Sequence, residues 1–132
     1  GPACSIRFGG IYGRGKSRLV SRLEAGEICP HEPAVISNRI HSVDCCRIFM
    51  HLLRRYQAGQ PLDSIYLAVD SQPTPLYEVM QWLANKNRIP LASLKQVAAS
   101  ARGGNKRCLN QRLLSSGFSL QYPSFKEGFS DR

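Results

Sequence analysis

Apolar residues along the chain switch between consecutive runs and a spacing of three to four residues, which indicates that strands alternate with helices. Residues 3–8 form a short extended run that breaks into glycines. Residues 64–69 form an apolar run bounded by Asp63 and Asp70, which is typical of a strand buried on both faces of a parallel sheet. Residues 35–41 are also predicted to be extended. The pattern therefore indicates an α/β chain with short parallel strands.

Helical spacing follows two of these extended segments. Ser17 can cap a helix that Gly26 ends, and Ser42 can cap another that Gly59 ends. The expected apolar face of the first helix comprises Leu19, Val20 and Leu23. The expected apolar stripe of the second comprises Cys45, Phe49, Leu52 and Tyr56.

Three shorter helical segments are expected in the second half of the chain. Thr74 caps a helix that Pro75 opens. Its buried positions are predicted to be Leu76, Val79, Met80 and Leu83. A short helix is predicted over residues 94–99, and Asn110 is predicted to cap a last one that Gly117 ends.

The glycine-rich run between the first strand and the first helix admits a phosphate-binding hypothesis. Residues 10–17 satisfy the pattern G-x-x-x-x-G-K-[ST], in which backbone amides hold phosphates, Lys16 reaches the terminal ones and Ser17 holds magnesium. Asp70 could supply the acidic partner. Arg7 weakens this hypothesis, because the strand before such a loop is normally apolar on both faces. An ATP- or GTP-binding protein is the first alternative function.

Four blocks of sequence, in order, carry a different resemblance. They are Arg-Phe-Gly-Gly-Ile-Tyr-Gly at 7–13, Asn-Arg-Ile-His-Ser-Val-Asp at 38–44, the strand and helix at 65–79, and the segments between 105 and 128. Together they resemble the last part of an extended or atypical short-chain dehydrogenase/reductase, of the nucleoside-diphosphate-sugar epimerase/dehydratase kind. Because the blocks span nearly the whole chain, they outweigh the single octapeptide.

The resemblance implies that residues 1–132 are a single domain, the C-terminal, substrate-side portion of a Rossmann-type enzyme whose cofactor-binding N-terminal half is absent. The parent protein would use NAD or NADP in an oxidoreductase reaction on a sugar nucleotide or a related carbonyl or hydroxyl substrate. The chain alone is expected to bind no cofactor and to be inactive. Its expected partners are the missing half of its own chain and, in the parent, a small-molecule substrate.

No catalytic residue is assigned within the chain. The family's proton donor and its partner form a Tyr-x-x-x-Lys pair on one helix face. Tyr12 and Lys16 have this spacing, but the glycines between them do not support a helical face. His41 is predicted to be a structural histidine at a strand end rather than a base.

The resemblance also assigns binding residues. In the family, the turn after the first strand lies beside the nicotinamide ring, and this position corresponds to Phe8, Gly9 and Gly10. The alternative is a tight turn without a ligand. Arg14 and Arg39 are the predicted substrate-binding residues, although the position at which many members carry a diphosphate-binding arginine is Ser37 here.

Five cysteines without a C-x-x-C spacing indicate reduced thiols and a cytoplasmic protein. Possible metal ligands are Cys29, His31, His41 and His51, but no H-x-x-x-H or paired-cysteine spacing supports such a site, so no metal site is predicted. No apolar run approaches the roughly 18 residues of a membrane helix.

The formal net charge of the 132-residue chain is +9, and two basic clusters concentrate it. One comprises Arg14, Lys16, Arg18 and Arg22, and the other Arg102, Lys106 and Arg107. Such clusters attract anions or form a solvated face. A small nucleic-acid-binding module is the second alternative, but no aromatic residues alternate with the arginines as stacking platforms. Self-association is expected, because the predicted strands would lack sheet neighbours.

Overall fold

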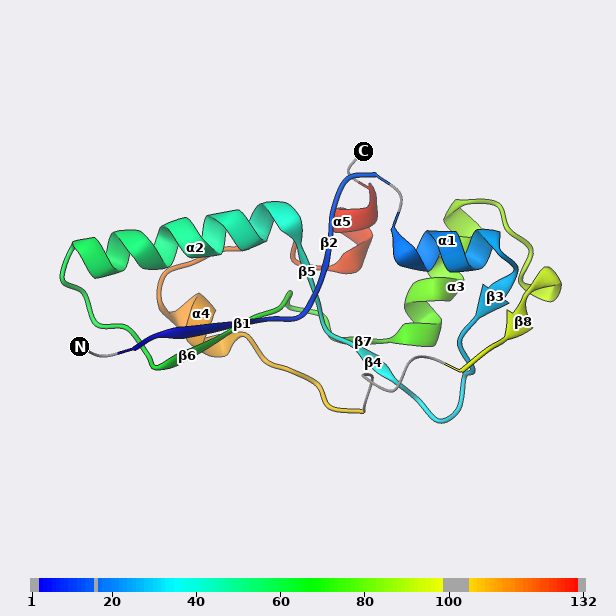
Figure 1. Cartoon of the computed structure of the whole chain (residues 1–132), viewed down its shortest axis with the longest axis horizontal. Coiled ribbons are helices and arrows are strands. Elements are labelled where there is room, and N and C mark those ends of the chain that lie inside the picture. Colours follow the sequence, from blue (N-terminus) through cyan, green and yellow to red (C-terminus); the bar gives the residue numbers. More distant parts are fainter. Residues whose placement is uncertain (1–2, 16, 99–104, 131–132) are drawn as a thin grey trace. The chain divides into compact units, whose positions relative to one another are not determined.

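The structure is a computed structural model that describes residues 3–15, 17–98 and 105–130 (Figure 1). Short strands, mostly in parallel pairs, alternate with helices, which confirms the predicted α/β fold class. Contacts divide the chain into two compact units. The first unit comprises residues 1–13, 38–73 and 108–132, and the second comprises residues 14–37 and 74–107. Each unit is described by itself.

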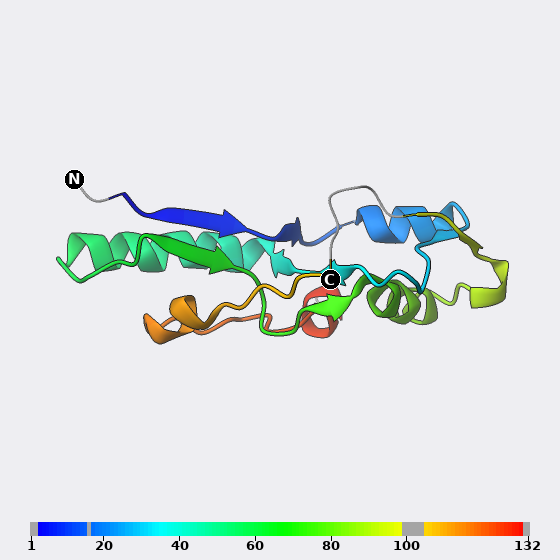
Figure 2. The same ribbon diagram turned by 90° about the horizontal axis from the view of Figure 1, so that it is seen from below.

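In its described residues, the first unit contains two parallel strand pairs and three helices. β1 (Ser5–Phe8) pairs with β6 (Ile65–Ala68), and β2 (Gly10–Tyr12) pairs with β5 (Arg39–His41). The helices are α2 (Ser42–Gln57), α4 (Gln111–Ser115) and α5 (Phe125–Ser130). β6 lies between β1 and α4 (Figure 2).

The described part of the second unit contains two short strand pairs and three helical segments. β3 (Glu27–Ile28) and β8 (Lys95–Gln96) are parallel, whereas β4 (Ile36–Ser37) and β7 (Thr74–Pro75) are antiparallel. The helical segments are α1 (Arg18–Glu24), α3 (Leu76–Lys86) and the 3₁₀ turn η1 (Leu91–Ser93).

The predicted cap of α1 and the predicted buried positions of α3 are confirmed. The Val20 N–H donates to Ser17 Oγ at 3.0 Å, so Ser17 caps α1 as expected. Leu76, Val79, Met80 and Leu83 of α3 are all buried. Gly26, Gly59 and Gly117, at which helices were expected to end, all have positive φ.

Other local predictions are wrong. α2 is capped by His41 rather than Ser42, because the Val43 N–H donates to His41 Nδ1 at 3.1 Å. The buried face of α2 comprises Asp44, Ile48 and Leu52. Of the predicted apolar stripe, Leu52 is buried and Cys45 packs against the core, whereas Phe49 and Tyr56 are exposed. Thr74 pairs in β7 instead of capping α3. Residues 95–96 form β8 rather than a helix, because their backbone is used in pairing with β3, and residue 99 lies outside the described residues.

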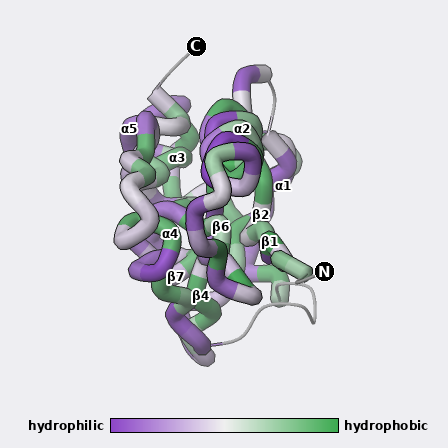
Figure 3. Tube along the Cα trace, turned by 90° about the vertical axis from the view of Figure 1, so that its left-hand side faces the viewer, coloured by the Kyte–Doolittle hydropathy of each residue, from purple (hydrophilic) through white to green (hydrophobic). Residues whose placement is uncertain are grey.

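The core of the first unit packs against one face of β1 and β6. Its buried members are Ile40, Ile48, Leu52, Tyr66, Ala68, Leu113 and Phe118, with Ile6 packed against them. Figure 3 shows hydrophobic positions along β1 and β2 and a mixture of hydrophobic and hydrophilic positions around α2. Ile65 and Leu67 point to the other face of β6 and are only half-buried, so the burial expected on both faces is found on one.

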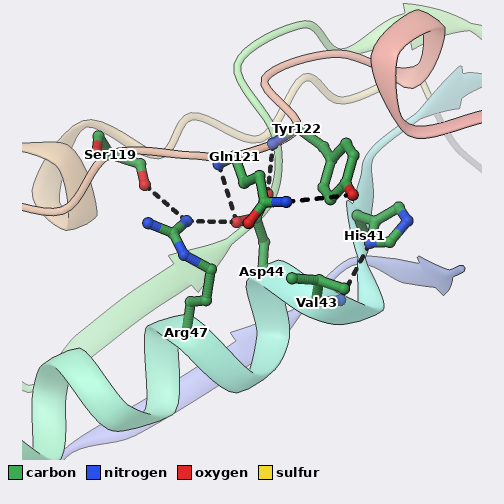
Figure 4. A network of polar contacts seen from close by, with 7 residues as sticks. All are labelled: His41, Val43, Asp44, Arg47, Ser119, Gln121 and Tyr122. Atoms are coloured by element: carbon green, nitrogen blue, oxygen red, sulfur yellow. Dashed lines mark hydrogen bonds and ion pairs between the residues drawn. The ribbon is translucent and has the colours of Figure 1, made fainter. Parts of the chain in front are cut away.

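A buried carboxylate attaches the C-terminal segment to α2 (Figure 4). Asp44 is fully buried, and its Oδ1 accepts hydrogen bonds from Arg47 Nη1 at 2.7 Å and from the Gln121 N–H at 3.0 Å. Its Oδ2 accepts one from the Tyr122 N–H at 2.9 Å. Charge-assisted bonds of this kind are about twice as strong as neutral ones. The segment around residues 121–122 is therefore held by α2, 77 to 78 residues away in sequence.

Asp70 is a second buried carboxylate with far fewer partners. Its side chain accepts one hydrogen bond, from the Gln72 N–H at 2.9 Å. Burial raises the pKa of Asp70 to about 7, because this bond and the positive charge of Arg39 only partly offset the loss of water and the negative charges of Glu127 and Asp44.

Asp44→Asn should destabilise the first unit by about 3 kcal/mol, because the amide would present N–H groups to a backbone N–H donor and leave Arg47 without its carboxylate. Urea unfolding followed by circular dichroism measures this change. Asp63→Asn, at an exposed position, is the control. Equal stability of the two variants would show that the Asp44 network does not hold the C-terminal segment.

Asp70 should make the chain less stable as the pH rises. Its carboxyl keeps its proton in the folded state up to about pH 7, whereas the unfolded state releases it near pH 4. The contribution is therefore fully present below about pH 4, falls between pH 4 and 7, and is constant above. Asp70→Asn should flatten this part of the profile when the free energy of unfolding is measured from pH 4.5 to 7.5. An unchanged slope would contradict the raised pKa.

Candidate functional site

The candidate site lies where the chain leaves β1 and enters β2. The Gly9 N–H donates to the Ala68 carbonyl at 3.1 Å, and the Gly10 N–H donates to the Asn38 carbonyl at 2.8 Å. The chain thus changes its pairing partner, from β6 to the β5 side, between two consecutive glycines. In open α/β sheets, ligands bind outside the carboxyl ends of the strands, and the ends of β1 and β6 meet here.

The two glycines are constrained in different ways. A Cβ at Gly9 would lie 2.5 Å from the Asn38 carbonyl oxygen and 2.9 Å from Val69 Cγ1, so packing alone requires glycine there. A Cβ at Gly10 would lie 3.5 Å from Arg39 Nη1, which is ordinary contact with a flexible side chain. Gly10 is exposed, and its φ is not in the left-handed region. Nothing in the described part of the fold requires a glycine at position 10.

An exposed aromatic ring and a guanidinium flank this glycine turn. Phe8 is 43% exposed at the end of β1. Arg39 is the register partner of Gly10 in the β2 and β5 pair. The structure therefore brings together four of the five residues predicted to bind ligands, namely Phe8, Gly9, Gly10 and Arg39. Such a surface suits a flat ring above the glycine and a negative charge beside the arginine.

Arg14, the fifth predicted residue, belongs to the second unit, whereas Arg39 belongs to the first. Arg22, which belongs to the same basic cluster, makes its contacts within the second unit. It donates to the Val97 carbonyl at 3.4 Å and pairs with Glu27 at 3.7 Å. Arg102 of the other basic cluster lies outside the described residues.

Asp70 lies next to Arg39 at this site. The sequence motifs did not predict it as a residue of the site. Its N–H donates to the Arg39 carbonyl at 2.7 Å, and its carboxylate is close enough to Arg39 for the guanidinium to lower its pKa. The signal in the sequence was a lone carboxylate directly after an apolar strand. In the sequence, Asp70 was assigned a chemical role only as the acidic partner of the phosphate-loop alternative.

The side chains of His41 on β5 and Tyr12 on β2 pack against aromatic rings of the C-terminal segment. His41 stacks on Tyr122 with ring centroids 3.9 Å apart, and Tyr12 stacks on Phe129 at 4.3 Å. Burial places the pKa of Tyr12 far above its usual value, because its phenol is shielded from water and lies near Asp70. These ring contacts pack both side chains against the C-terminal segment.

The phosphate-loop interpretation of residues 10–17 is not favoured by the structure. Gly10, Ile11 and Tyr12 lie in β2, and their backbone is used in pairing with β5, so their amides are not arranged around a phosphate. The helix that follows, α1, has only 7 residues. Lys16 lies outside the described residues.

Three further features of the described residues are their thiols, their possible metal ligands and the apolar character of their helices. All five cysteines are free, as predicted. Across the described ranges, no group of three His, Cys, Asp or Glu side chains could hold a metal ion. Among the helices of those ranges, none has the length and apolar composition needed to cross a membrane.

Comparison with protein-family models finds no match, and neither does comparison with curated proteins. Solved structures do match. A protein from Methylobacillus flagellatus described as an NAD-dependent epimerase/dehydratase is 32% identical, with a TM-score of 0.76 over 95% of this chain and 44% of its own. Human epimerase family protein SDR39U1, solved with NADPH, is 16% identical, with a TM-score of 0.75 over 96% of this chain and 46% of its own.

DesIV, the dTDP-glucose 4,6-dehydratase from Streptomyces venezuelae solved with NAD and TYD bound, is 21% identical, with a TM-score of 0.69 over 95% of this chain and 40% of its own. The chain thus spans less than half the length of each of these proteins. The likenesses confirm the resemblance indicated by the sequence motifs: over nearly its whole length, the chain carries the fold of part of an NAD-dependent epimerase/dehydratase of the short-chain dehydrogenase/reductase type.

Proposed function

We propose that the chain is the C-terminal, substrate-side portion of an NAD(P)-dependent epimerase/dehydratase-like oxidoreductase. Phe8, Gly9 and Gly10 would lie against the nicotinamide ring of NAD or NADP, which supplies hydride transfer. The pyrophosphate-binding turn and the proton donor would come from another part of the protein. The human neighbour with NADPH and the dehydratase with NAD support this assignment of the cofactor.

Gly10 is the observation that carries the proposal. Its neighbours leave room for a side chain, its backbone conformation is open to other residues, and it faces outward at the carboxyl end of β1. A glycine that the fold itself does not require is explained by a ligand that approaches the backbone closely. Gly9, by contrast, is already explained by Asn38 and Val69.

A sugar nucleotide or a related carbonyl or hydroxyl compound is the proposed substrate class. Arg39 would face the anionic part of the substrate, and substrate binding by Arg14 of the second unit stays a prediction. The dTDP-glucose dehydratase among the neighbours acts on a compound of this class by its name. A cytoplasmic location is proposed because the five free thiols would stay reduced there.

Gly10→Val in the full-length protein should weaken NAD(P) binding roughly ten- to a hundredfold, the effect of about 1–3 kcal/mol of overpacking. Thermal unfolding should be unchanged, since the position is exposed and open. Fluorescence titration with NADH and NADPH measures the affinity. Ser5→Val, which adds similar bulk to an exposed position of β1, is the matched control.

Lys16→Ala separates this proposal from the phosphate-loop alternative. It should leave NAD(P) affinity unchanged, whereas a phosphate loop requires its lysine for ATP or GTP. Unchanged NAD(P) affinity in Gly10→Val, or loss of ATP binding in Lys16→Ala, would overturn the proposed function.

The 132-residue chain by itself should neither bind NAD(P) nor turn over a substrate, because the pyrophosphate turn and the Tyr-x-x-x-Lys pair would lie elsewhere. Isothermal titration calorimetry of the isolated chain with NADH and NADPH should show no binding heat. Micromolar affinity in this experiment would contradict the proposed division of the site.

A further inference from the structure

Asp70 is a buried carboxyl group whose backbone is held on both sides. It is 3% exposed, and its own N–H donates to the Arg39 carbonyl at 2.7 Å. The Asn110 side chain donates to the Val69 carbonyl at 3.0 Å and to Ser71 Oγ at 3.2 Å, so both neighbours of Asp70 are fixed. The carboxyl group therefore stays inside the fold when its charge changes.

Charged groups from three other elements act on Asp70. Two of them are carboxylates and one is a cation: Glu127 of α5, Asp44 of α2 and Arg39 of β5. Asp44 is already paired with Arg47 at 2.7 Å. Tyr12 of β2 lies near Asp70 as well, but burial raises the pKa of its phenol and keeps it neutral. In the described part of the chain, Arg39 is therefore the cation that favours the ionised form of Asp70.

The guanidinium of Arg39 lies beside the open glycine of the turn. A Cβ on Gly10 would be 3.5 Å from Arg39 Nη1 and 3.7 Å from Arg39 Cγ, and Gly10 itself is exposed. The side chain of Arg39 thus runs along a surface position, while its carbonyl accepts the bond from the buried Asp70. An anion that approaches the turn therefore meets the same positive charge that acts on Asp70.

One positive charge thus attracts two negative groups, and each of them reduces the attraction for the other. Burial raises the pKa of Asp70 to about 7, so its carboxyl group loses its proton near neutral pH. The ionised carboxylate offsets part of the attraction of Arg39 for an anion, whereas the protonated carboxyl group does not. An anion bound at Arg39 makes ionisation of Asp70 less favourable in turn, because coupling between two sites is reciprocal.

We propose that Asp70 couples binding of the substrate's anionic group at Arg39 to the uptake of one proton. As the anion binds, a proton from the solvent adds to the Asp70 carboxylate and forms its O–H bond. Asp70 acts through Arg39 and does not itself touch the anion. This coupling rests on the proposed function, in which Arg39 faces the anionic part of the substrate. It adds that substrate binding tightens as the pH falls below neutral.

Sulfate is the probe, because it keeps both negative charges throughout the pH range in which Asp70 titrates. The isotope-labelled carboxyl carbon of Asp70 is titrated by NMR in the full-length protein, in sodium sulfate and in sodium chloride of equal ionic strength. The spectrum of Asp70→Asn assigns the signal. Its midpoint should be about one pH unit higher in sulfate, the shift that a neighbouring charge produces. Sulfate binding, measured from the Gly10 amide signal, should be about tenfold tighter below this midpoint than above it.

Three variants give the controls. Arg39→Gln should abolish the difference between sulfate and chloride, because it removes the shared cation. Asp70→Asn should bind sulfate with the same affinity at pH 6 and pH 8, which separates Asp70 from histidines such as His41, two residues along β5 from Arg39. Asp63→Asn, at an exposed position, should keep the pH dependence of the wild-type protein.

Equal midpoints in sulfate and chloride would overturn the coupling, and so would a sulfate shift that persists in Arg39→Gln. Titration of the same full-length sample with NADPH separates the coupling from the proposed function. NADPH binding without a sulfate shift overturns the coupling alone, whereas a sulfate shift without NADPH binding overturns the proposed function alone.

Discussion

Asp44 accepts three hydrogen bonds in the interior of the first unit, and the position of the C-terminal segment depends on them. With residues 121–122 held in this way, Tyr122 stacks on His41, which in turn caps α2. Tyr12 and Phe129 stack beside them, and Gly128 must lack a side chain, because a Cβ there would collide with the Tyr12 ring. The last residues of the chain thereby fix β2 and β5, the two strands that carry the glycine turn and Arg39.

The candidate site lies on the two strands that these ring contacts hold in place. Gly9 packs against the Asn38 carbonyl and Val69, so the point at which the chain changes strands cannot shift. Phe8 and Gly10 are exposed at the end of β1 and the start of β2, and Arg39 lies beside Gly10. The same chain therefore contains one glycine that serves the fold and one that the fold leaves unexplained. This difference, rather than the number of glycines, supports a ligand at the turn.

Elements determined by local chemistry could be predicted from the sequence. The strand at Ile65–Ala68, the Ser17 cap of α1 and the buried positions of α3 are each indicated by the local pattern of residues. The burial of Asp44 on α2 could not be predicted, because its carboxylate accepts bonds from backbone groups 77 and 78 residues away. The grouping of Phe8, Gly9 and Gly10 was predicted from motif order, whereas Asp70 was missed because only the folded chain places it behind Arg39.

A crystal structure of the full-length protein with NADH or NADPH bound tests the central claim most directly. The account predicts that the nicotinamide ring packs on the Gly10 backbone within about 4 Å, the distance of van der Waals contact. Phe8 should border the ring, and Arg39 should face the substrate side. A nicotinamide ring bound elsewhere, with Gly10 open to solvent, would contradict the account.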